Sequence, residues 1–374
     1  MCYRCLFVMT KLLILSSDTG EGHNSAARAI QSAAEAVRFP VSLRKPLEES
    51  SATNRSMAHL YNLFLTHRPG WVGGFLKTID FLKPNEADFF YRRARRYIQR
   101  FIESERPDVL LSVHPMLNHL IQRWVGEQRL DIRCITFVTD PFPPFWKGWS
   151  SPYVRNYFVL SDDAGARLVA DGIEADMIER VTMPVRNGFK PRSPDEVRTL
   201  RARLGIDGTT ILLNGGARGG GPLPHLVRTV REAAPDANII VVCGHNRRVL
   251  EKIKAMRDAR IRPFGFVPDI HDLVGAADLV ITKPGALATY ETLASEVPVA
   301  LTAVGGLMPQ ESGLFKAAAR YGFGFAVETL EDLGEVIRQG LGGWRGKREA
   351  IRDFYRPGST QEIIERIQPS HVRT

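Results

Sequence analysis

Short apolar runs alternate with helical patterns along most of the chain. Each run is long enough for one buried strand, ends in a Gly, Pro or polar turn, and is followed by apolar residues at helical spacing. Runs of this kind lie at 11–16, 109–113, 132–139, 209–213, 238–243 and 279–282. The alternation predicts an α/β fold. Because it restarts after a Pro-containing polar segment at 185–194, we expect two doubly wound, Rossmann-like domains that face each other across a cleft.

The polar segment also gives the expected domain boundaries, because linkers between domains are exposed and rich in such residues. We predict an N-terminal domain at residues 1–187 and a C-terminal domain at residues 195–345. Residues 346–374 contain helical patterns interrupted by Pro357. We expect these last helices to pack back toward the N-terminal domain.

The stretch 278–311 carries the clearest candidate site. A Pro-Gly turn follows the apolar run 279–282, and a helical pattern begins at once. Free N–H groups of a helix start at the carboxyl end of a strand suit a phosphate. Glu291, one turn into that helix, suits the hydroxyls of a ribose, and Gln310 with Glu311 suits those of a sugar. An ordinary strand–helix unit with a surface Glu explains the same pattern, and the residues alone leave both interpretations open.

Three polar residues of the first half lie at the predicted carboxyl edge of its sheet. His23 stands at a helix entrance after a Gly loop, where the positive end of the helix dipole would lower its pKa, as a general base requires. His114 and Asp140 each end a predicted strand. An aromatic, Pro-rich loop at 141–149 follows Asp140. A capping or hydrogen-bonded structural role for His23 stays open.

Charge and composition favour an anionic partner for a soluble protein. The 374 residues carry a net charge of +9, with 44% hydrophobic and 24% charged residues. The basic pattern at 88–106 has an apolar side and fits either an anionic membrane surface or a solvated helix face. The segment 53–83, apolar next to Gly and Pro, fits either a lipid-contacting loop or a packed helical hairpin.

The cysteines argue against a metal site and for a reducing compartment. Cys2 and Cys5 form a CxxC without a second pair at zinc spacing, and Cys134 and Cys243 lie in apolar runs. No apolar run is long enough for a transmembrane helix. We therefore expect no metal and a cytoplasmic protein.

Several motifs together resemble one family. They are Ser17-Asp18-Thr19-Gly20-Glu21-Gly22-His23-Asn24, Val138-Thr139-Asp140 with the loop to Trp146, Cys243-Gly244-His245-Asn246, Gly265-Phe266-Val267, Thr282-Lys283-Pro284-Gly285 with Glu291, and Pro309-Gln310-Glu311. On these motifs the chain resembles the monogalactosyldiacylglycerol synthase and processive diacylglycerol glucosyltransferase family. The family has the GT-B fold and is related to the peptidoglycan lipid-intermediate glycosyltransferase.

The resemblance implies an inverting transfer of a hexose from a UDP-sugar to a lipid hydroxyl, with diacylglycerol as the expected acceptor. It implies that the N-terminal domain faces the acceptor and the inner face of the cell membrane, that the C-terminal domain binds the UDP-sugar, and that no cofactor or nucleic acid takes part. The implied catalytic residues are His23 and Asp140, and the implied acceptor-binding residues are Gly22, His114 and Trp146. The implied donor-binding residues are Gly215, Gly216, His245, Asn246, Phe266, Val267, Lys283, Pro284, Gly285, Thr289, Glu291, Gln310 and Glu311.

Two other functions remain as alternatives. A UDP-N-acetylglucosamine epimerase of the same fold would act on its nucleotide sugar without an acceptor. A non-catalytic lipid- or nucleotide-binding module would turn nothing over. A nicotinamide-dependent oxidoreductase is disfavoured, because neither Gly-rich loop has the GxGxxG spacing.

Overall fold

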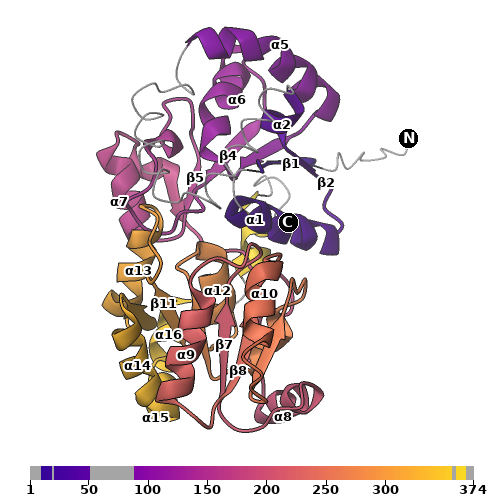
Figure 1. Cartoon of the computed structure of the whole chain (residues 1–374). Coiled ribbons are helices and arrows are strands. Elements are labelled where there is room, and N and C mark those ends of the chain that lie inside the picture. The colour runs from indigo at the N-terminus through magenta and orange to yellow at the C-terminus, as the bar shows by residue number, and fades with distance from the viewer. Residues whose placement is uncertain (1–9, 19–20, 51–87, 356–358, 368–374) are drawn as a thin grey trace, which may run out of the picture.

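Two six-stranded parallel sheets form the two halves of the molecule (Figure 1). The computed structural model describes residues 10–18, 21–50, 88–355 and 359–367. The strand order is β2-β1-β3-β4-β5-β6 in the first sheet and β12-β11-β10-β7-β8-β9 in the second, and every neighbouring pair is parallel. The predicted pair of doubly wound α/β halves is therefore confirmed.

The first half contains the sheet of β1 to β6 and its covering helices. Its strands are β1 Leu12–Leu15, β2 Val41–Arg44, β3 Val109–Ser112, β4 Arg133–Phe137, β5 Tyr157–Val159 and β6 Ile178–Arg180. Its helices are α1 Glu21–Ala36, α2 Pro46–Ser50, α5 Asp88–Glu105, α6 Pro115–Glu127, η1 Lys147–Trp149, α7 Asp162–Ala170 and η2 Ala175–Met177.

The second half contains the sheet of β7 to β12. Its strands are β7 Thr210–Asn214, β8 Asn238–Val242, β9 Ile261–Phe264, β10 Leu279–Thr282, β11 Val299–Thr302 and β12 Gly324–Val327. Its helices are α8 Pro194–Arg203, α9 Leu223–Ala233, α10 Arg247–Lys254, α11 His271–Ala276, α12 Ala286–Ala294, α13 Glu311–Arg320, α14 Leu330–Arg338, α15 Gly340–Arg345 and α16 Arg348–Phe354, and α17 Ser359–Ile367 follows them in sequence.

The central strands are largely apolar because helices cover both faces of each sheet. All four residues of β1 and of β10 are buried. One face of the first sheet packs on α1 and the other on α5 and α6. In the second sheet, α9 and α14 cover one face, and α11, α12 and α13 cover the other.

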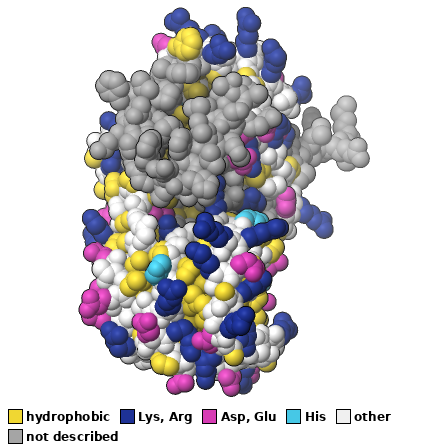
Figure 2. Space-filling view, in the orientation of Figure 1, with side chains coloured by type: hydrophobic (Ala, Val, Ile, Leu, Met, Phe, Trp, Pro, Cys, Tyr) yellow, Lys and Arg dark blue, Asp and Glu magenta, His cyan; other side chains and the backbone are white. Residues whose placement is uncertain are grey.

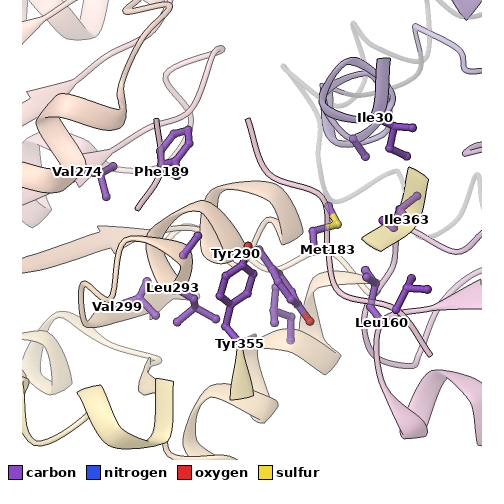
Figure 3. Packing of buried hydrophobic residues seen from close by; sticks show 14 of the residues in the cluster. Ile30, Leu160, Met183, Phe189, Val274, Tyr290, Leu293, Val299, Tyr355 and Ile363 are labelled. Carbon is purple, nitrogen blue, oxygen red and sulfur yellow. The ribbon is translucent and has the colours of Figure 1, made fainter. Parts of the chain in front are cut away.

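One hydrophobic cluster runs through both halves and joins them. Ile30 of α1, Met183 of the connecting segment and Tyr290 of α12 all belong to it (Figure 3). Ile363 of α17 packs into the same cluster beside α1, and the Arg133 guanidinium of β4 donates hydrogen bonds to backbone carbonyls near the end of α17. The helix α17 therefore completes the core of the first half, although it follows the second half in sequence.

Some local expectations were wrong. The polar pair Asn24 and Ser25 predicts a helix N-cap at that point, but α1 begins earlier, at Glu21, and the Asn24 side chain bonds Ser16 and Asp18. The apolar residues at 181–183 predict a strand there, but the strand that forms is β6 at Ile178–Arg180, where pairing with β5 decides the register. The segment 53–83 lies outside the described residues. Among the helices that the structure describes, none has the length and hydropathy needed to cross a membrane.

Candidate functional site

His23 lies in the first turn of α1, against the carboxyl end of β4. Its Nδ1 is 2.8 Å from the Thr139 hydroxyl oxygen, and its ring meets the ring of His114 edge to face, with the ring centroids 5.0 Å apart. Asp140 follows Thr139 directly. One Asp140 carboxylate oxygen accepts a hydrogen bond of 2.8 Å from the Trp149 indole N–H. The structure thus brings His23, His114 and Asp140 together at one sheet edge, as their predicted positions require.

Burial sets the pKa values of this cluster. It lowers the pKa of His23, and the negative charge of Asp140 opposes this effect. It raises the pKa of Asp140, against the effects of His23 and of the Trp149 hydrogen bond. It also holds the pKa of His114 well below 6.5, with the charge of His23 acting in the same direction. The predicted direction for His23 is therefore correct, and burial is the leading cause. A neutral imidazole can accept a proton.

The three predicted acceptor residues have different surroundings. His114 is the N-cap of α6, where its Nδ1 accepts a hydrogen bond from the backbone N–H of Met116. Trp146 is half-buried and its ring lies against Gly148, where a Cβ would clash with it. Gly22 is exposed in the first turn of α1, beside His23. Their roles as acceptor contacts stay predictions.

The aromatic loop after Asp140 packs the two halves against each other. Phe142 is 2% exposed, and its ring lies 5.7 Å from Tyr321 and 6.2 Å from Phe354, both in the second half. Gly313 of α13 lies close against this loop, because a Cβ there would clash with the backbone carbonyl oxygens of Pro143 and Phe142. This contact places the loop after Asp140 beside the first turn of α13.

The Gly-rich loop after β7 is a tight backbone cradle. Gly216 has a φ of 67°, and its N–H donates to the Asn214 side chain at 2.9 Å. Gly215 and Gly219 pack so closely on the neighbouring loop after β8 that a Cβ on either would clash. Asn246 ties the two loops together, since it caps α10 and donates to the Gly219 carbonyl.

Aromatic rings flank this cradle. The ring of His245 stacks on Phe266 with centroids 4.3 Å apart and planes 14° from parallel, and Phe266 is 49% exposed. Val267 is half-buried and packs on the central cluster. An exposed ring of this kind can cover the flat face of a base.

Lys283 supplies a positive charge between the cradle and α13. Its side chain extends past Gly221 and Gly220, so closely that a Cβ added to these glycines would lie 3.5 and 3.9 Å from its Cε. Its charge also reaches Glu311 and lowers the pKa of that carboxyl, which burial raises. Within the part of the chain that the structure describes, the Lys283 ammonium makes no hydrogen bond or ion pair, so it is available to an anion.

Glu291 is buried and paired. It lies on α12, which begins after Gly285 and the buried Pro284, and it is 4% exposed. Both of its carboxylate oxygens accept hydrogen bonds from the Arg186 guanidinium, which comes from the segment that connects the halves. Burial raises the pKa of Glu291, and Arg186 opposes this effect. A ribose contact to Glu291 stays a prediction, and it would have to share this carboxylate with Arg186.

Two buried side-chain oxygens, one on α12 and one at the start of α13, make no hydrogen bond within the described residues. The Glu311 carboxylate accepts a hydrogen bond from the Met308 N–H at 3.0 Å. The side-chain oxygens of Gln310 and of Thr289 are buried and have no hydrogen-bond partner among the described residues. Unpaired buried oxygens are unfavourable without a bound water or ligand. The unpaired oxygen of Gln310, which precedes Glu311 in the sequence, therefore fits the predicted hexose contacts.

Sequence reasoning missed three residues of this site. Thr139 contacts the imidazole of His23, Trp149 holds Asp140, and Arg186 pairs with Glu291. Thr139 directly precedes the predicted site residue Asp140, and this adjacency is the signal that could have pointed to it. Nothing local marks Arg186, whose partner is 105 positions away in the sequence. Within the described ranges, no group of three or more His, Cys, Asp or Glu could hold a metal ion.

Two family models match the two halves. Residues 23–185 match the monogalactosyldiacylglycerol (MGDG) synthase model, and residues 210–304 match the glycosyltransferase family 28 C-terminal domain. The chain is 26% identical over 351 residues to a chloroplastic monogalactosyldiacylglycerol synthase of Spinacia oleracea, covering 89% of this chain and 66% of that protein. It is 22% identical over 302 residues to the processive diacylglycerol beta-glucosyltransferase of Bacillus licheniformis, covering 78% of this chain and 76% of that protein. The chain thus spans slightly less than two thirds of the length of the spinach relative.

Solved structures agree with the fold. Acinetobacter baumannii MurG matches with a TM-score of 0.64 at 15% identity, over 96% of this chain and 99% of that one. Anabaena Alr3699/HepE, solved with UDP-glucose, matches with a TM-score of 0.56 at 14% identity, over 96% and 99%. These similarities confirm the predicted GT-B fold. The chain is thus similar to the monogalactosyldiacylglycerol synthases over 23–185 and to the glycosyltransferase family 28 C-terminal domain over 210–304.

Proposed function

We propose that the protein transfers a hexose from a UDP-sugar to a lipid hydroxyl, with inversion, and that diacylglycerol is the acceptor. The observation that supports this most is the arrangement of charge at the two sheet edges. A neutral imidazole beside a carboxyl group lies on the first half, and an available ammonium beside a glycine cradle lies on the second. The names of the spinach and Bacillus relatives favour a glycolipid product, and the UDP-glucose complex of a protein with this fold favours the donor.

The second half would hold the leaving group. The N–H groups of the loop at Gly215 and Gly216 would bind the diphosphate, and Lys283 would neutralise its growing charge. His245, Asn246, Phe266 and Val267 would surround the base and the cradle. Glu291 would bind the ribose, and Gln310 with Glu311 the hexose hydroxyls.

The first half would activate the acceptor. The lipid hydroxyl oxygen attacks the anomeric carbon from the side opposite UDP, and His23 takes the hydroxyl proton. The bond from that carbon to the phosphate oxygen breaks, and its electron pair leaves with UDP. Asp140 would stabilise the imidazolium that forms, because its carboxylate lies close enough to raise the pKa of His23.

The helix α5 would bring the protein to an anionic membrane surface mainly through charge. The apolar residues Tyr91, Ile98 and Phe101 are buried against the sheet and cannot enter a bilayer, whereas Phe89 in the first turn is 68% exposed. The arginines of α5 are exposed, and Figure 2 shows basic side chains at the end of the molecule where Figure 1 places α5. Basic surfaces of this kind are attracted to the anionic inner face of a cell membrane.

The deciding experiment incubates the purified chain with vesicles of mixed lipid acceptors and a panel of labelled UDP-sugars. Thin-layer analysis should show one labelled glycolipid. His23→Ala should lower turnover by about 100-fold or more while calorimetric UDP binding persists, because only the base is lost. His225→Ala, which changes an exposed histidine on α9, is the matched control. Full turnover of His23→Ala would refute the role of His23.

The same incubation separates the alternatives. An epimerase would convert a UDP-sugar in the absence of any lipid. A binding module would raise its melting temperature with UDP or lipid and release no UDP. Either result would overturn the proposed transfer.

A further inference from the structure

Asn24 uses both ends of its side-chain amide to hold the start of α1. Its Oδ1 accepts a hydrogen bond of 2.8 Å from the Ser16 hydroxyl, and its Nδ2 donates one of 3.1 Å to a carboxylate oxygen of Asp18. Asn24 is 2% exposed and Ser16 is fully buried, so water does not compete for the bond between them. Ser16 directly follows β1, and Asn24 lies in the first turn of α1. The amide therefore ties the first turn of α1 to the end of β1.

The residues that Asn24 contacts are themselves fixed by α2. The Asp18 backbone N–H donates to a Glu48 carboxylate oxygen at 2.8 Å, and the Ser17 hydroxyl donates to the same oxygen at 2.6 Å. Lys45, just before α2, forms an ion pair with the Asp18 carboxylate. Glu48 and Ser17 are both buried. The amide of Asn24 thus bonds to a segment whose position is set by β1 on one side and by α2 on the other.

His23 directly precedes Asn24 in this turn, and its ring lies against residues of two other elements. Its Nδ1 is 2.8 Å from the Thr139 hydroxyl oxygen, beyond the carboxyl end of β4, and its ring centroid is 5.0 Å from that of His114, beyond the end of β3. Where the imidazole meets these residues depends on where the first turn of α1 lies. The Asn24 amide fixes that turn.

We propose that Asn24 is a positioning residue of the reaction, which holds the first turn of α1 on β1 and thereby keeps the imidazole of His23 against the end of β4. Its bonds are not those of a helix cap, because both of its partners are side chains. The catalytic consequence rests on the proposed function, since a misplaced catalytic group loses much of its effect. The placement of the ring can be measured without any substrate.

The test compares variants by kinetics and by an NMR titration of His23. Asn24→Leu keeps the approximate volume of the side chain and removes both hydrogen bonds. Ser16→Ala removes only the bond to the end of β1. Asn156→Ala is the matched control, because its side-chain amide also donates a hydrogen bond within the first half, to the Cys134 carbonyl near the opposite end of β4. The His23 signals are assigned by their loss in His23→Gln.

The rate should fall without a loss of donor binding. Asn24→Leu should lower kcat by about 10- to 100-fold, because the base is displaced from the acceptor hydroxyl. The donor KM should stay nearly unchanged, because the proposed donor contacts lie in the second half. Ser16→Ala should lower kcat by a smaller factor, and Asn156→Ala should leave it unchanged.

The pKa of His23 should rise in Asn24→Leu. Burial is the largest influence on this pKa and lowers it from 6.5, so a loosened turn that exposes the ring should bring it back toward that value. The other groups that act on the ring, namely Asp140, the backbone of Val113 and the neighbouring His114, are the same in the variant. Because the base works in its neutral form, the acidic limb of the pH–rate profile should move to higher pH.

Exchanging the side chains at positions 18 and 24 tests the bond between them. Asn24→Asp places two carboxylates within hydrogen-bond distance, and their repulsion should lower kcat at least as much as Asn24→Leu does. Asn24→Asp combined with Asp18→Asn again provides one amide and one carboxylate, with the donor now at position 18, and should recover a large part of the rate. The rates are compared well above the pKa of His23, because the moved charge itself raises that pKa.

A normal kcat and a normal His23 pKa in Asn24→Leu would overturn the proposal. If Asn24→Leu fails to fold, a double variant no faster than Asn24→Asp, or a Ser16→Ala protein identical to the wild type, would overturn it as well. A wild type that glycosylates no lipid would instead refute the proposed function, and the titration of His23 would still decide whether Asn24 holds the ring in place.

Discussion

The Glu291 carboxylate and the Arg186 guanidinium form a two-point ion pair, with Nε to Oε1 at 2.6 Å and Nη2 to Oε2 at 3.1 Å. Glu291 is buried on α12, and Arg186 comes from the segment between the halves. The pair therefore ties the predicted ribose contact to the connection between the two sheets.

Removing one partner of this ion pair should destabilise the folded protein. Arg186→Ala leaves a buried carboxylate without its partner and should lower the free energy of unfolding by about 2 kcal/mol or more. The double variant Arg186→Ala with Glu291→Gln should recover part of this loss, because no buried charge remains. Urea unfolding of the four proteins in this mutant cycle measures both values. Additive losses would show that the two residues do not interact.

Glu291 should also discriminate nucleotides by their ribose. The wild type should bind UDP about 10- to 100-fold more tightly than the 2′,3′-dideoxy nucleotide, since hydrogen bonds to a carboxylate would be lost. Glu291→Gln should reduce this ratio, and calorimetry with both nucleotides measures it. An unchanged ratio in Glu291→Gln would place the ribose elsewhere.

Gly313→Ala should disturb the contact between the halves. Its Cβ would meet the backbone carbonyls of Phe142 and Pro143, which cannot move aside as a flexible side chain can. We expect a loss of about 1–3 kcal/mol in stability and a lower kcat, because the first turn of α13 would be pushed away from Asp140.

Gly126→Ala is the matched control for that variant. Gly126 also lies within a helix, α6, and a Cβ there would meet nothing within 4 Å. The change should stabilise the protein by about 0.5–1 kcal/mol through helix propensity. Thermal melts of both variants should therefore move in opposite directions, and a stabilising Gly313→Ala would show that the loop contact is loose.

Acid should destabilise the protein through His114. Burial holds its folded-state pKa well below 6.5, so below pH 6.5 the unfolded chain binds a proton that the native state does not. Stability should be complete above about pH 6.5 and fall as the pH decreases toward the folded-state pKa, by up to about 1.4 kcal/mol per pH unit for this group. His114→Asn, which keeps a good helix cap, should reduce the slope. Urea unfolding between pH 5 and 8 measures the change of the unfolding free energy with pH. An identical slope in the wild type and in His114→Asn would assign the pH dependence to other groups.

The arginines of α5 should govern attachment to anionic vesicles. Replacing the exposed Arg92, Arg93, Arg96 and Arg100 by Ser should weaken binding to such vesicles by about 1000-fold, at roughly 1 kcal/mol for each charge near the surface. Replacing Arg247, Arg248, Lys252 and Lys254 of α10 removes the same charge from the other half and should have little effect. Co-sedimentation at two salt concentrations compares them. Equal weakening by both sets would indicate attraction by net charge alone.

The sequence patterns correctly predicted the features that neighbouring residues determine, namely individual strands, turns and helix starts. The strand β10, its Pro-Gly turn and α12 follow from an apolar run and a helix start, and their positions match. His23, His114 and Asp140 could be placed at one edge because parallel strands end together. Long-range contacts decided the rest. Asn24 has the pattern of a helix cap, yet it bonds Ser16 and Asp18 while α1 begins earlier.

The contacts of the aromatic loop at 141–149 also could not be predicted from its own sequence. Trp146 and Trp149 stand three positions apart, and the short turn of η1 decides that Trp149 points to Asp140. Phe142 looks like part of a ligand loop, but the rings of the second half bury it. Which aromatic residue faces a ligand depends on how the halves meet, and no pattern within the loop contains that information.

The attachment of α17 to α1 and β4 bears on how the chain matures during translation. The hydrophobic interior of the first half gains Ile363 and the backbone acceptors for Arg133 only after the whole second half has been synthesised. A ribosome-bound chain that has completed just the first sheet would therefore expose an apolar groove along α1. During synthesis the first half would complete its core only when α17 emerges, and the groove would be a target for chaperones until then.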